Sequence, residues 1–189
     1  MPKIISSTII SLDGYAADTN GDISFFDVDE KFFDISKMLT DEADTAIYGR
    51  KTFEMMDAYW PDAADQPDAE KHENEHTSWY KQAQKIVISS QKQESRVGNT
   101  ITIGENIKQK IEEIKSKTDK NLIIFGSPSI VDLFTSLDLI DEYWIFIFPI
   151  ILGDGVPIFQ IKKHLSKLEL IDTIKFDNGS IGLNYKVLR

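Results

Sequence analysis

Three short segments follow apolar runs of the 189-residue chain and carry groups that commonly bind phosphate. They are Gly49-Arg50-Lys51-Thr52, Ser89-Ser90 and Gly126-Ser127-Pro128-Ser129. Hydroxyl groups, backbone N–H groups and cationic side chains all make favourable hydrogen bonds to phosphate oxygens. Strand-to-helix turns also contain glycine and serine for purely structural reasons, so one such segment alone indicates little. Three of them together, one with an Arg-Lys-Thr run, favour a phosphate-bearing ligand.

The residues around these segments predict alternating strands and helices. Each segment follows a short apolar run that is typical of a buried strand, and two of them lead into residues with helical spacing. In open α/β sheets, ligands bind beyond the carboxyl ends of the strands, where helix N-termini attract anions. The predicted strands are residues 4–12, 45–48, 85–88, 100–103, 122–125, 140–152, 165–176 and 180–188. The predicted helices are residues 29–39, a helix after Gly49 with Phe53, Met55 and Met56 inside, and residues 105–115 and 129–137.

The C-terminal third differs from the rest of the chain. Asp177-Asn178-Gly179 joins two predicted strands and is a strong hairpin signal. We therefore expect an α/β fold with a mostly parallel central sheet, helices on both faces and an antiparallel C-terminal hairpin. Residues 57–77 are polar and acidic and are predicted as a long surface excursion, with one or two helical turns in residues 78–84. With neither a repeat nor a linker, residues 1–189 are predicted to form a single domain.

Composition excludes several classes of protein. The formal net charge is −10, from 21 basic and 31 acidic residues, which opposes nucleic-acid binding. The longest apolar stretch, residues 143–152, is too short to cross a membrane. The chain has no cysteine, which excludes disulfides and thiolate chemistry and is compatible with the reducing cytoplasm, where we expect the protein.

One pattern resembles a metal site. His72-Glu73-Asn74-Glu75-His76 has the spacing of a zinc protease, and Glu94 is a formal third ligand. Because the surrounding residues are almost all polar, nothing is expected to bury such a helix beside a cleft, and we predict a solvated segment and no metal. The nucleophile elbow, the Gly-x-Gly-x-x-Gly fingerprint and the P-loop pattern are absent from the sequence.

The order of the motifs carries a family resemblance that runs from about residue 3 to 188. Residues 46–54, with Gly-Arg-Lys-Thr, resemble the strand and helix that carry Gly-Arg-x-Thr in dihydrofolate reductases. Residues 85–91 resemble the next strand of that family and its Ser-Ser end. Residues 11–16, 139–142 and 149–159 are similar to the RibD C-terminal branch, the riboflavin-biosynthesis reductases. The resemblance implies a dihydrofolate-reductase-like, three-layer α/β/α fold.

The resemblance also implies roles for the three segments. Gly49, Thr52 and the Lys51 backbone would hold the pyrophosphate of NADPH, and Arg50, Ser89 and Ser90 its 2′-phosphate. A guanidinium binds phosphate strongly, so this set favours NADPH over NADH. Gly126, Ser127 and Ser129 would line a second phosphate junction, although Ser127 replaces the second glycine of the family's Gly-Gly.

The catalytic residue is less clearly marked. Alignment with the family's substrate helix places Asp29 where dihydrofolate reductases carry their pterin-binding acid, and a carboxylate there could support protonation of the substrate. Asp29 could equally be only the N-cap of a helix. Asp13 is a second candidate, and a turn role is the alternative for it. Phe26, Phe33 and Trp60 could wall an apolar slot for a flat substrate or belong to the core.

The function implied is an NADPH-dependent oxidoreductase that transfers a hydride to a small pterin-, pyrimidine- or riboflavin-precursor-like substrate. A zinc deaminase like that of bifunctional riboflavin enzymes is not expected, because the chain lacks cysteine. The alternative is a non-catalytic nucleotide-binding or oligomeric module of the same fold. Apolar residues on both faces of the predicted strand 140–152, with the run Tyr143-Trp144-Ile145-Phe146, favour a homodimer through the antiparallel region.

Overall fold

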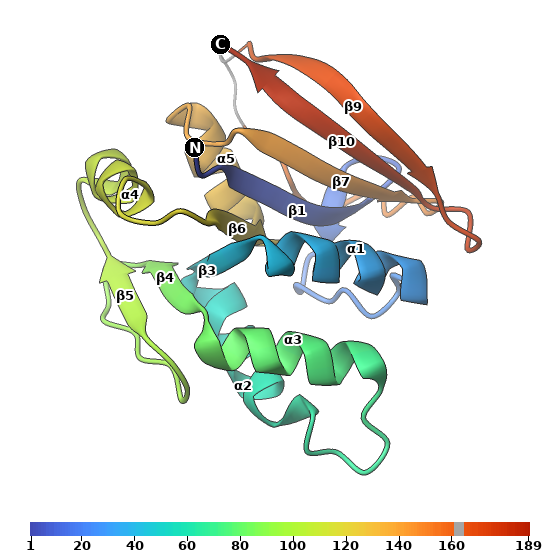
Figure 1. Cartoon of the computed structure of the whole chain (residues 1–189). Coiled ribbons are helices and arrows are strands. Elements are labelled where there is room, and N and C mark those ends of the chain that lie inside the picture. The colour runs from blue at the N-terminus through green and yellow to red at the C-terminus, as the bar shows by residue number, and fades with distance from the viewer. Residues whose placement is uncertain (161–164) are drawn as a thin grey trace. The chain divides into compact units, whose positions relative to one another are not determined.

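The computed structural model describes residues 1–160 and 165–189, which form two compact units (Figure 1). The first unit contains Met1–Pro2 and Glu30–Ile123, and the second contains Lys3–Asp29 and Ile124–Arg189. One of the three histidines, His164, lies outside the described residues.

The first unit is built around three parallel strands. β4 (Gln84–Ile88) pairs with β3 (Ala43–Gly49) on one side and with β5 (Thr100–Ile103) on the other. Ile47, Ile86 and Val87 are fully buried, as the short apolar runs predict. The helices of this unit are α1 (Glu30–Asp41), α2 (Arg50–Ala63), α3 (Lys71–Gln82) and α4 (Ile107–Lys115).

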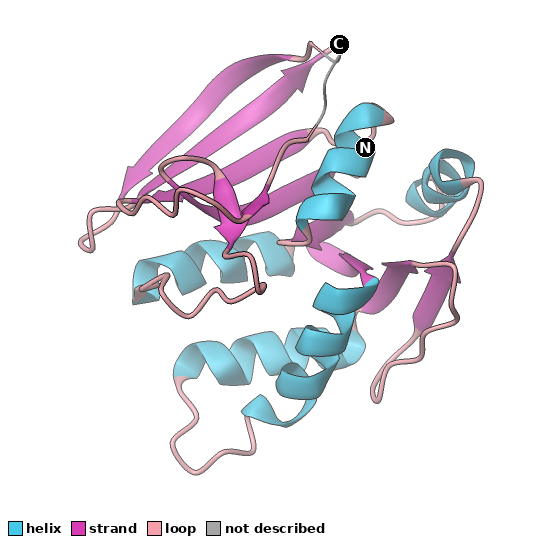
Figure 2. Ribbon diagram, turned by 180° about the vertical axis from the view of Figure 1, so that it is seen from behind, coloured by secondary structure: helices cyan, strands magenta, loops and turns pink. Residues whose placement is uncertain are grey.

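The second unit contains the antiparallel part of the fold. β1 (Ile4–Ser11) pairs in parallel with β7 (Glu142–Phe148), which pairs antiparallel with β10 (Ile181–Leu188), and β10 pairs with β9 (Lys167–Lys175). β2 (Tyr15–Ala17) and β8 (Val156–Pro157) form a small separate pair. β6 (Asn121–Phe125) spans the boundary between the units, and α5 (Pro128–Ser136) follows it (Figure 2).

The predicted fold class is confirmed. The sheet is mostly parallel, helices flank it in a three-layer α/β arrangement, and antiparallel strands follow at the C-terminus. The hairpin prediction is also correct, since β9 and β10 are joined through Asp177-Asn178-Gly179, where Gly179 has a φ of +87°. The prediction that residues 1–189 form a single domain without a linker stays a prediction.

Three local predictions are wrong. Residues 57–77 are not a surface excursion, because α2 continues to Ala63 and α3 begins at Lys71. Met55 is 47% exposed and does not lie on the inner side of α2. The strand predicted over residues 140–152 is the shorter β7, because Pro149 follows Phe148 directly and cannot donate a backbone hydrogen bond to a ladder.

Tertiary contacts explain why the polar sequence of α3 is helical. The side chains of Glu70 and Glu73 form a capping box at its first turn. Thr77 Oγ1 donates to the Trp60 carbonyl at 2.9 Å, and Trp79 Nε1 donates to the Ala43 carbonyl at 2.8 Å. The His72 ring stacks on the Phe33 ring of α1, with centroids 3.7 Å apart. The two histidines of the zinc-like pattern are therefore half-buried against aromatic neighbours.

The packing around His76 makes the stability of the fold depend on pH. Its ring centroid lies 4.1 Å from that of Trp60, and burial, with a contribution from His72, lowers the pKa of His76 to about 3. An unfolded histidine titrates near 6.5, so below that pH the unfolded chain binds a proton that the folded chain does not. We expect the His76 contribution to the free energy of unfolding to fall by a few kcal/mol from about pH 6.5 towards pH 3. Urea unfolding at a series of pH values measures this dependence.

His76→Gln is the matched variant, because it keeps a polar side chain that does not titrate. Carboxylates still titrate in the variant, so only the difference between the two pH profiles reports His76. Parallel profiles for the two proteins would contradict this account of His76.

Candidate functional site

In the first unit, two of the predicted segments lie together at the carboxyl ends of the parallel strands, which we call the sheet edge. Gly49 pairs with Ile88 across β3 and β4, so Arg50 and Ser89 directly follow paired residues. Ile88 pairs with Ile103 of β5, and the Ser89 N–H donates to the Ile103 carbonyl at 3.0 Å. The carboxyl ends of three parallel strands therefore meet beside the start of α2, which is where α/β sheets bind ligands.

A glycine that sequence reasoning missed completes this edge. Gly104 follows β5, and a Cβ atom on it would lie 3.0 Å from the Ser89 carbonyl oxygen and 3.3 Å from the Ser90 Cα. The backbones after β4 and β5 therefore approach too closely for a larger residue to fit without a shift. The sequence signal was present, because Gly104 follows an apolar run just as Gly49 and Gly126 do.

The start of α2 provides the positive groups of the edge. Gly49 is the N-cap residue, and the first turn of the helix contains no acidic side chain. Arg50 and Lys51 are exposed, and Thr52 is half-buried. Arg50 Nη1 forms an ion pair with Glu54 Oε1 at 2.8 Å, with both side chains close to half exposed. Exposed ion pairs of this kind contribute at most about 1 kcal/mol to stability. Arg50 can therefore release Glu54 and bind a doubly charged phosphate instead.

A buried carboxylate accepts hydrogen bonds from the loop that carries Ser89 and Ser90. Asp57 of α2 is 7% exposed and accepts hydrogen bonds from Ser95 Oγ, from the Arg96 N–H at 3.0 Å and from the Tyr80 hydroxyl at 3.1 Å. Burial, followed by the Asp57 charge, raises the pKa of Tyr80 well above its usual value. Tyr80 is therefore a neutral hydrogen-bond donor, and the loop is tied to both α2 and α3.

A buried lysine of β4 donates a hydrogen bond to the same loop. Lys85 is fully buried, and its Nζ donates to the Tyr80 carbonyl and, at 3.1 Å, to the Val97 carbonyl. Burial lowers the pKa of Lys85 to about 8, while the Asp57 charge opposes the shift. A Cβ at Gly98, which has a φ of +70°, would lie 2.8 Å from the Lys81 carbonyl oxygen as well as from Lys85 Nζ, so glycine is favoured there.

The second unit contains the other predicted junction. The Gly126 N–H donates to the Ser7 carbonyl at 2.9 Å, and the Ser127 carbonyl accepts from the N–H groups of Ile130 and Val131. Ser127 is the buried N-cap residue of α5, whereas Ser129 is exposed. The structure thus places Gly126, Ser127 and Ser129 at a helix start, as predicted.

Ser127 has a backbone conformation that favours glycine. Its φ of 53° and ψ of 66° lie in the left-handed region, which costs a residue with a Cβ about 1–2 kcal/mol. We expect Ser127→Gly to raise the free energy of unfolding by up to about 1 kcal/mol, because relief of this strain outweighs the greater flexibility of glycine in the unfolded chain. Chemical denaturation measures the change. Ser129→Gly, in the same turn of the chain, is the control and should destabilise slightly; a loss of stability in Ser127→Gly would show that the serine side chain is needed.

Asp13 has a structural role in a turn, which was the alternative to a catalytic role. Its carboxylate accepts hydrogen bonds from Ser11 Oγ and from the N–H groups of Leu152 at 3.1 Å and Gly153 at 2.8 Å. The Ser11 hydroxyl and these N–H groups lower the pKa of Asp13, so it is an ionised acceptor that holds the loop after β7. Nearby, a Cβ at Gly155 would lie 2.2 Å from the Ala17 carbonyl oxygen, which only glycine avoids.

The remaining predicted residues belong to both units. Asp29 is half-buried in the second unit and directly precedes α1. Phe26 is buried in the second unit against Phe148, with ring centroids 5.0 Å apart, as a core residue would be. Phe33 and Trp60 belong to the first unit, where they contact His72 and His76 of α3.

Over residues 1–160 and 165–189, no three His, Asp or Glu side chains are grouped so that they could hold a metal ion. Within the same residues, no helix has the length and apolar character that a membrane crossing requires.

Fold and site together define a three-layer α/β protein with polar and glycine-containing junctions at the carboxyl ends of its parallel strands. Residues 2–181 match the sequence model of the RibD C-terminal domain, and the chain belongs to this family. The resemblance inferred from the motifs is thereby confirmed.

Three individual proteins are similar to this chain. The protein YyaP of Bacillus subtilis (strain 168) is 30% identical over 186 residues, which cover 97% of this chain and 94% of YyaP. A Shewanella sp. PV-4 protein named for riboflavin biosynthesis has a similar structure, with a TM-score of 0.72, 23% identity and 99% coverage of both chains. A diaminohydroxyphosphoribosylaminopyrimidine deaminase/5-amino-6-(5-phosphoribosylamino)uracil reductase from Thermotoga maritima has a TM-score of 0.70 and 15% identity, over 99% of this chain and 57% of the other.

Proposed function

We propose that the protein is an NADPH-dependent reductase that acts on a small pterin-, pyrimidine- or riboflavin-precursor-like substrate in the cytoplasm, in or near riboflavin biosynthesis. Family membership supports a reductase, and reductase is part of the name of the Thermotoga relative. The single observation that carries the cofactor assignment is the shared sheet edge of Arg50 and Ser89 at the start of α2.

The residues present fit a dinucleotide phosphate. Arg50, Ser89 and Ser90 supply a guanidinium and two hydroxyls for the 2′-phosphate, and Gly49, Thr52 and the Lys51 backbone supply the helix start for the pyrophosphate. We assign Gly126, Ser127 and Ser129 to the second phosphate junction. The bound nicotinamide would supply the hydride, while the protein would align donor and acceptor and exclude water.

Rapid-mixing measurement of NADPH oxidation tests the proposal. The enzyme with bound NADPH is mixed with a panel of pterins, pyrimidines, riboflavin precursors and quinones. Turnover of a compound of the first three classes supports the proposal. Tight binding of NADPH without turnover of any compound favours the alternative, a nucleotide-binding module of the same fold.

Asp29 is our candidate for the proton-supplying group. We expect Asp29→Asn to leave NADPH binding unchanged and to lower kcat/KM about 100- to 10,000-fold, because the substitution removes the carboxyl that would support protonation of the substrate. If Asp29 only caps α1, the variant will instead keep its kcat/KM and show a lower melting temperature.

A further inference from the structure

The segment between β4 and β5, residues 89–99, is a connection without regular secondary structure (Figure 1). The structure describes all of it, and it contains neither a helix nor a strand. Parallel strands are usually joined through a helix, whose own hydrogen bonds hold the crossover in place. This β4–β5 connection begins with Ser89 and Ser90, which we assign to the 2′-phosphate. Side chains of neighbouring elements must therefore fix the backbone around these two serines.

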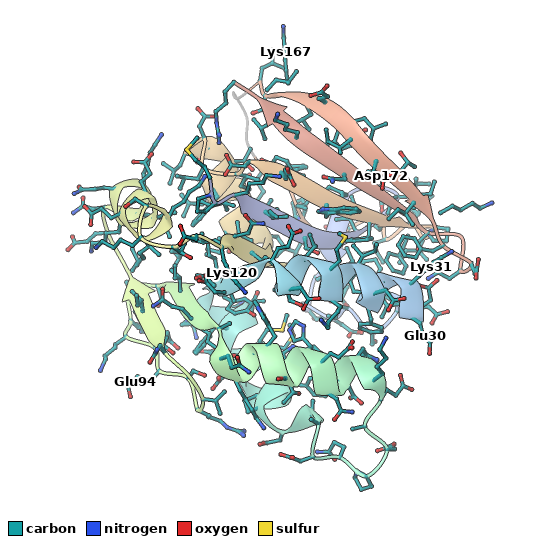
Figure 3. All side chains as sticks on the ribbon, in the orientation of Figure 1. Glu30, Lys31, Glu94, Lys120, Lys167 and Asp172 are labelled. Carbon is teal, nitrogen blue, oxygen red and sulfur yellow. The ribbon has the colours of Figure 1, made fainter. Side chains whose placement is uncertain are left out.

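The sequence of β5 supplies two hydroxyl groups that bind the connection. Its residues are Thr-Ile-Thr-Ile, and successive side chains of a strand point to opposite faces. Thr100 and Thr102 therefore lie on one face and the two isoleucines on the other. The connection runs back along β5, because Gln93 binds Thr102 and Ser95 binds Thr100. Glu94, which Figure 3 labels, lies between these two anchored residues and is exposed.

Thr102 holds the first half of the connection, residues 90–93. Its Oγ1 accepts a hydrogen bond from the Gln93 N–H at 2.8 Å and donates one to the Gln93 carbonyl at 3.2 Å. In the part of the chain that the structure describes, no other group outside the connection hydrogen-bonds to residues 90–93. One hydroxyl group therefore fixes the backbone that follows the two serines.

Two further hydrogen bonds link Gln93 to Ser89. Gln93 Nε2 donates to the Gln91 carbonyl at 3.2 Å, and the Gln91 N–H donates to Ser89 Oγ at 3.0 Å. The Ser89 hydroxyl oxygen is thus an acceptor, while none of the described residues accepts its proton. A hydroxyl that accepts a hydrogen bond becomes a stronger donor. The position of the Gln91 N–H therefore sets the direction in which Ser89 can donate to an anion.

We propose that Thr102 is a positioning residue for the 2′-phosphate, which orients the Ser89 hydroxyl through Gln93 and Gln91. The inference rests on the proposed function, because the Ser89 hydroxyl has this role only if the cofactor is NADPH. The Thr102 hydroxyl does not itself bind the cofactor, since its proton is bound by the Gln93 carbonyl.

Thr102→Val tests the proposal, because valine keeps the branched shape that suits a strand and removes only the hydroxyl. We expect NADPH binding to weaken about 3- to 10-fold and NADH binding to stay unchanged. Complete loss of a hydrogen bond to a charged group weakens binding about 10- to 100-fold, and a misdirected hydroxyl loses part of that. Thr102→Ser restores a hydroxyl and should recover most of the NADPH affinity. Calorimetric titration of each cofactor measures these affinities.

Thr100→Val is the matched control, because it removes the same group from the same face of the same strand. Thr100 Oγ1 accepts from the Ser95 N–H at 3.0 Å, but the Ser95 hydroxyl also donates to Asp57. The second half of the connection consequently stays in place, and both cofactor affinities should stay unchanged. Equal losses of NADPH affinity in the two valine variants overturn the proposal, because general loosening of the connection would then explain them.

A double-mutant cycle separates a positioning role from a general effect on the fold. Ser89→Ala alone is expected to weaken NADPH binding about 10-fold, because it removes the donor to phosphate. If Thr102 acts through Ser89, adding Thr102→Val to Ser89→Ala causes less than about a twofold further loss. Fold-changes that simply multiply in the double variant overturn the proposal.

Amide hydrogen exchange of the cofactor-free protein, followed by NMR, tests the hydrogen bonds without any cofactor. Thr102→Val should accelerate exchange of the Gln91 and Gln93 amides at least about threefold, whereas Thr100→Val should not. Unchanged exchange at both amides overturns the proposal.

The binding data distinguish the failure of this proposal from the failure of the proposed function. A wild-type protein that binds NADPH and NADH equally refutes the cofactor assignment and the role of Thr102 together. A wild-type protein that prefers NADPH, with a Thr102→Val variant that keeps the full preference, overturns only the role of Thr102.

Discussion

Replacing Arg50 with alanine is expected to weaken NADPH binding about 10- to 100-fold and to leave NADH binding nearly unchanged. The two cofactors differ only in the 2′-phosphate, and Arg50 lies beside Ser89 at the edge that we assign to this group. A charge-assisted hydrogen bond to phosphate contributes about 1.5–3 kcal/mol, which corresponds to this range. Titration of each cofactor by fluorescence or calorimetry measures both affinities.

Two variants serve as controls for this prediction. Arg50→Lys keeps the charge but loses the planar fork, and should recover only part of the NADPH affinity. Glu54→Gln removes the ion-pair partner of Arg50 and should strengthen NADPH binding slightly, because the guanidinium no longer has to leave a carboxylate. Equal losses of NADPH and NADH affinity in Arg50→Ala would refute the 2′-phosphate assignment.

Asp57→Ala is expected to lower the free energy of unfolding by about 3–5 kcal/mol, the largest effect on stability predicted here. The substitution removes the acceptor of three hydrogen bonds, from Tyr80, Ser95 and the Arg96 N–H. It also removes the negative charge that partly offsets the burial of Lys85. Urea unfolding followed by circular dichroism measures the loss.

Tyr48→Phe is the matched control for Asp57→Ala. The Tyr48 hydroxyl is fully buried and has no hydrogen-bond partner among the described residues, so its removal forfeits no such bond. The free energy of unfolding should stay unchanged or rise by up to about 1 kcal/mol. Similar losses in both variants would mean that the loss in Asp57→Ala is not specific to the Asp57 hydrogen bonds.

Sequence patterns predicted the strands best where a short apolar run lies in a buried position. Residues 85–88 and 122–125 illustrate this, since almost all of them are buried and each run ends within one residue of its observed strand. The places of the proposed phosphate junctions followed from the same runs, because the polar residues begin where the strands end.

The polar helix α3 could not be predicted in this way. Its first turns contain no aliphatic residue, and its contacts with Phe33, Trp60 and Ala43 come from other elements. The pairing of Asp57 with Ser95 and Arg96 likewise joins residues 38 and 39 positions apart. Local propensity carries no information on such contacts. One local signal was available, namely the glutamates Glu70 and Glu73 at capping-box spacing.

The Asp13 contacts and the pairing of β1 with β7 have a consequence for how the chain acquires its structure during synthesis. Asp13 binds backbone groups 139 and 140 positions later, and the Ile4 N–H donates to Asp141, 137 positions later. At about 5–20 residues per second, a ribosome needs roughly 7–30 seconds to deliver these partners. Meanwhile Ile4, Ile5 and Ile10 remain exposed on the nascent chain. Strands β3, β4 and β5 pair at shorter range, so the first unit is expected to fold while the N-terminal strand still waits for its partner.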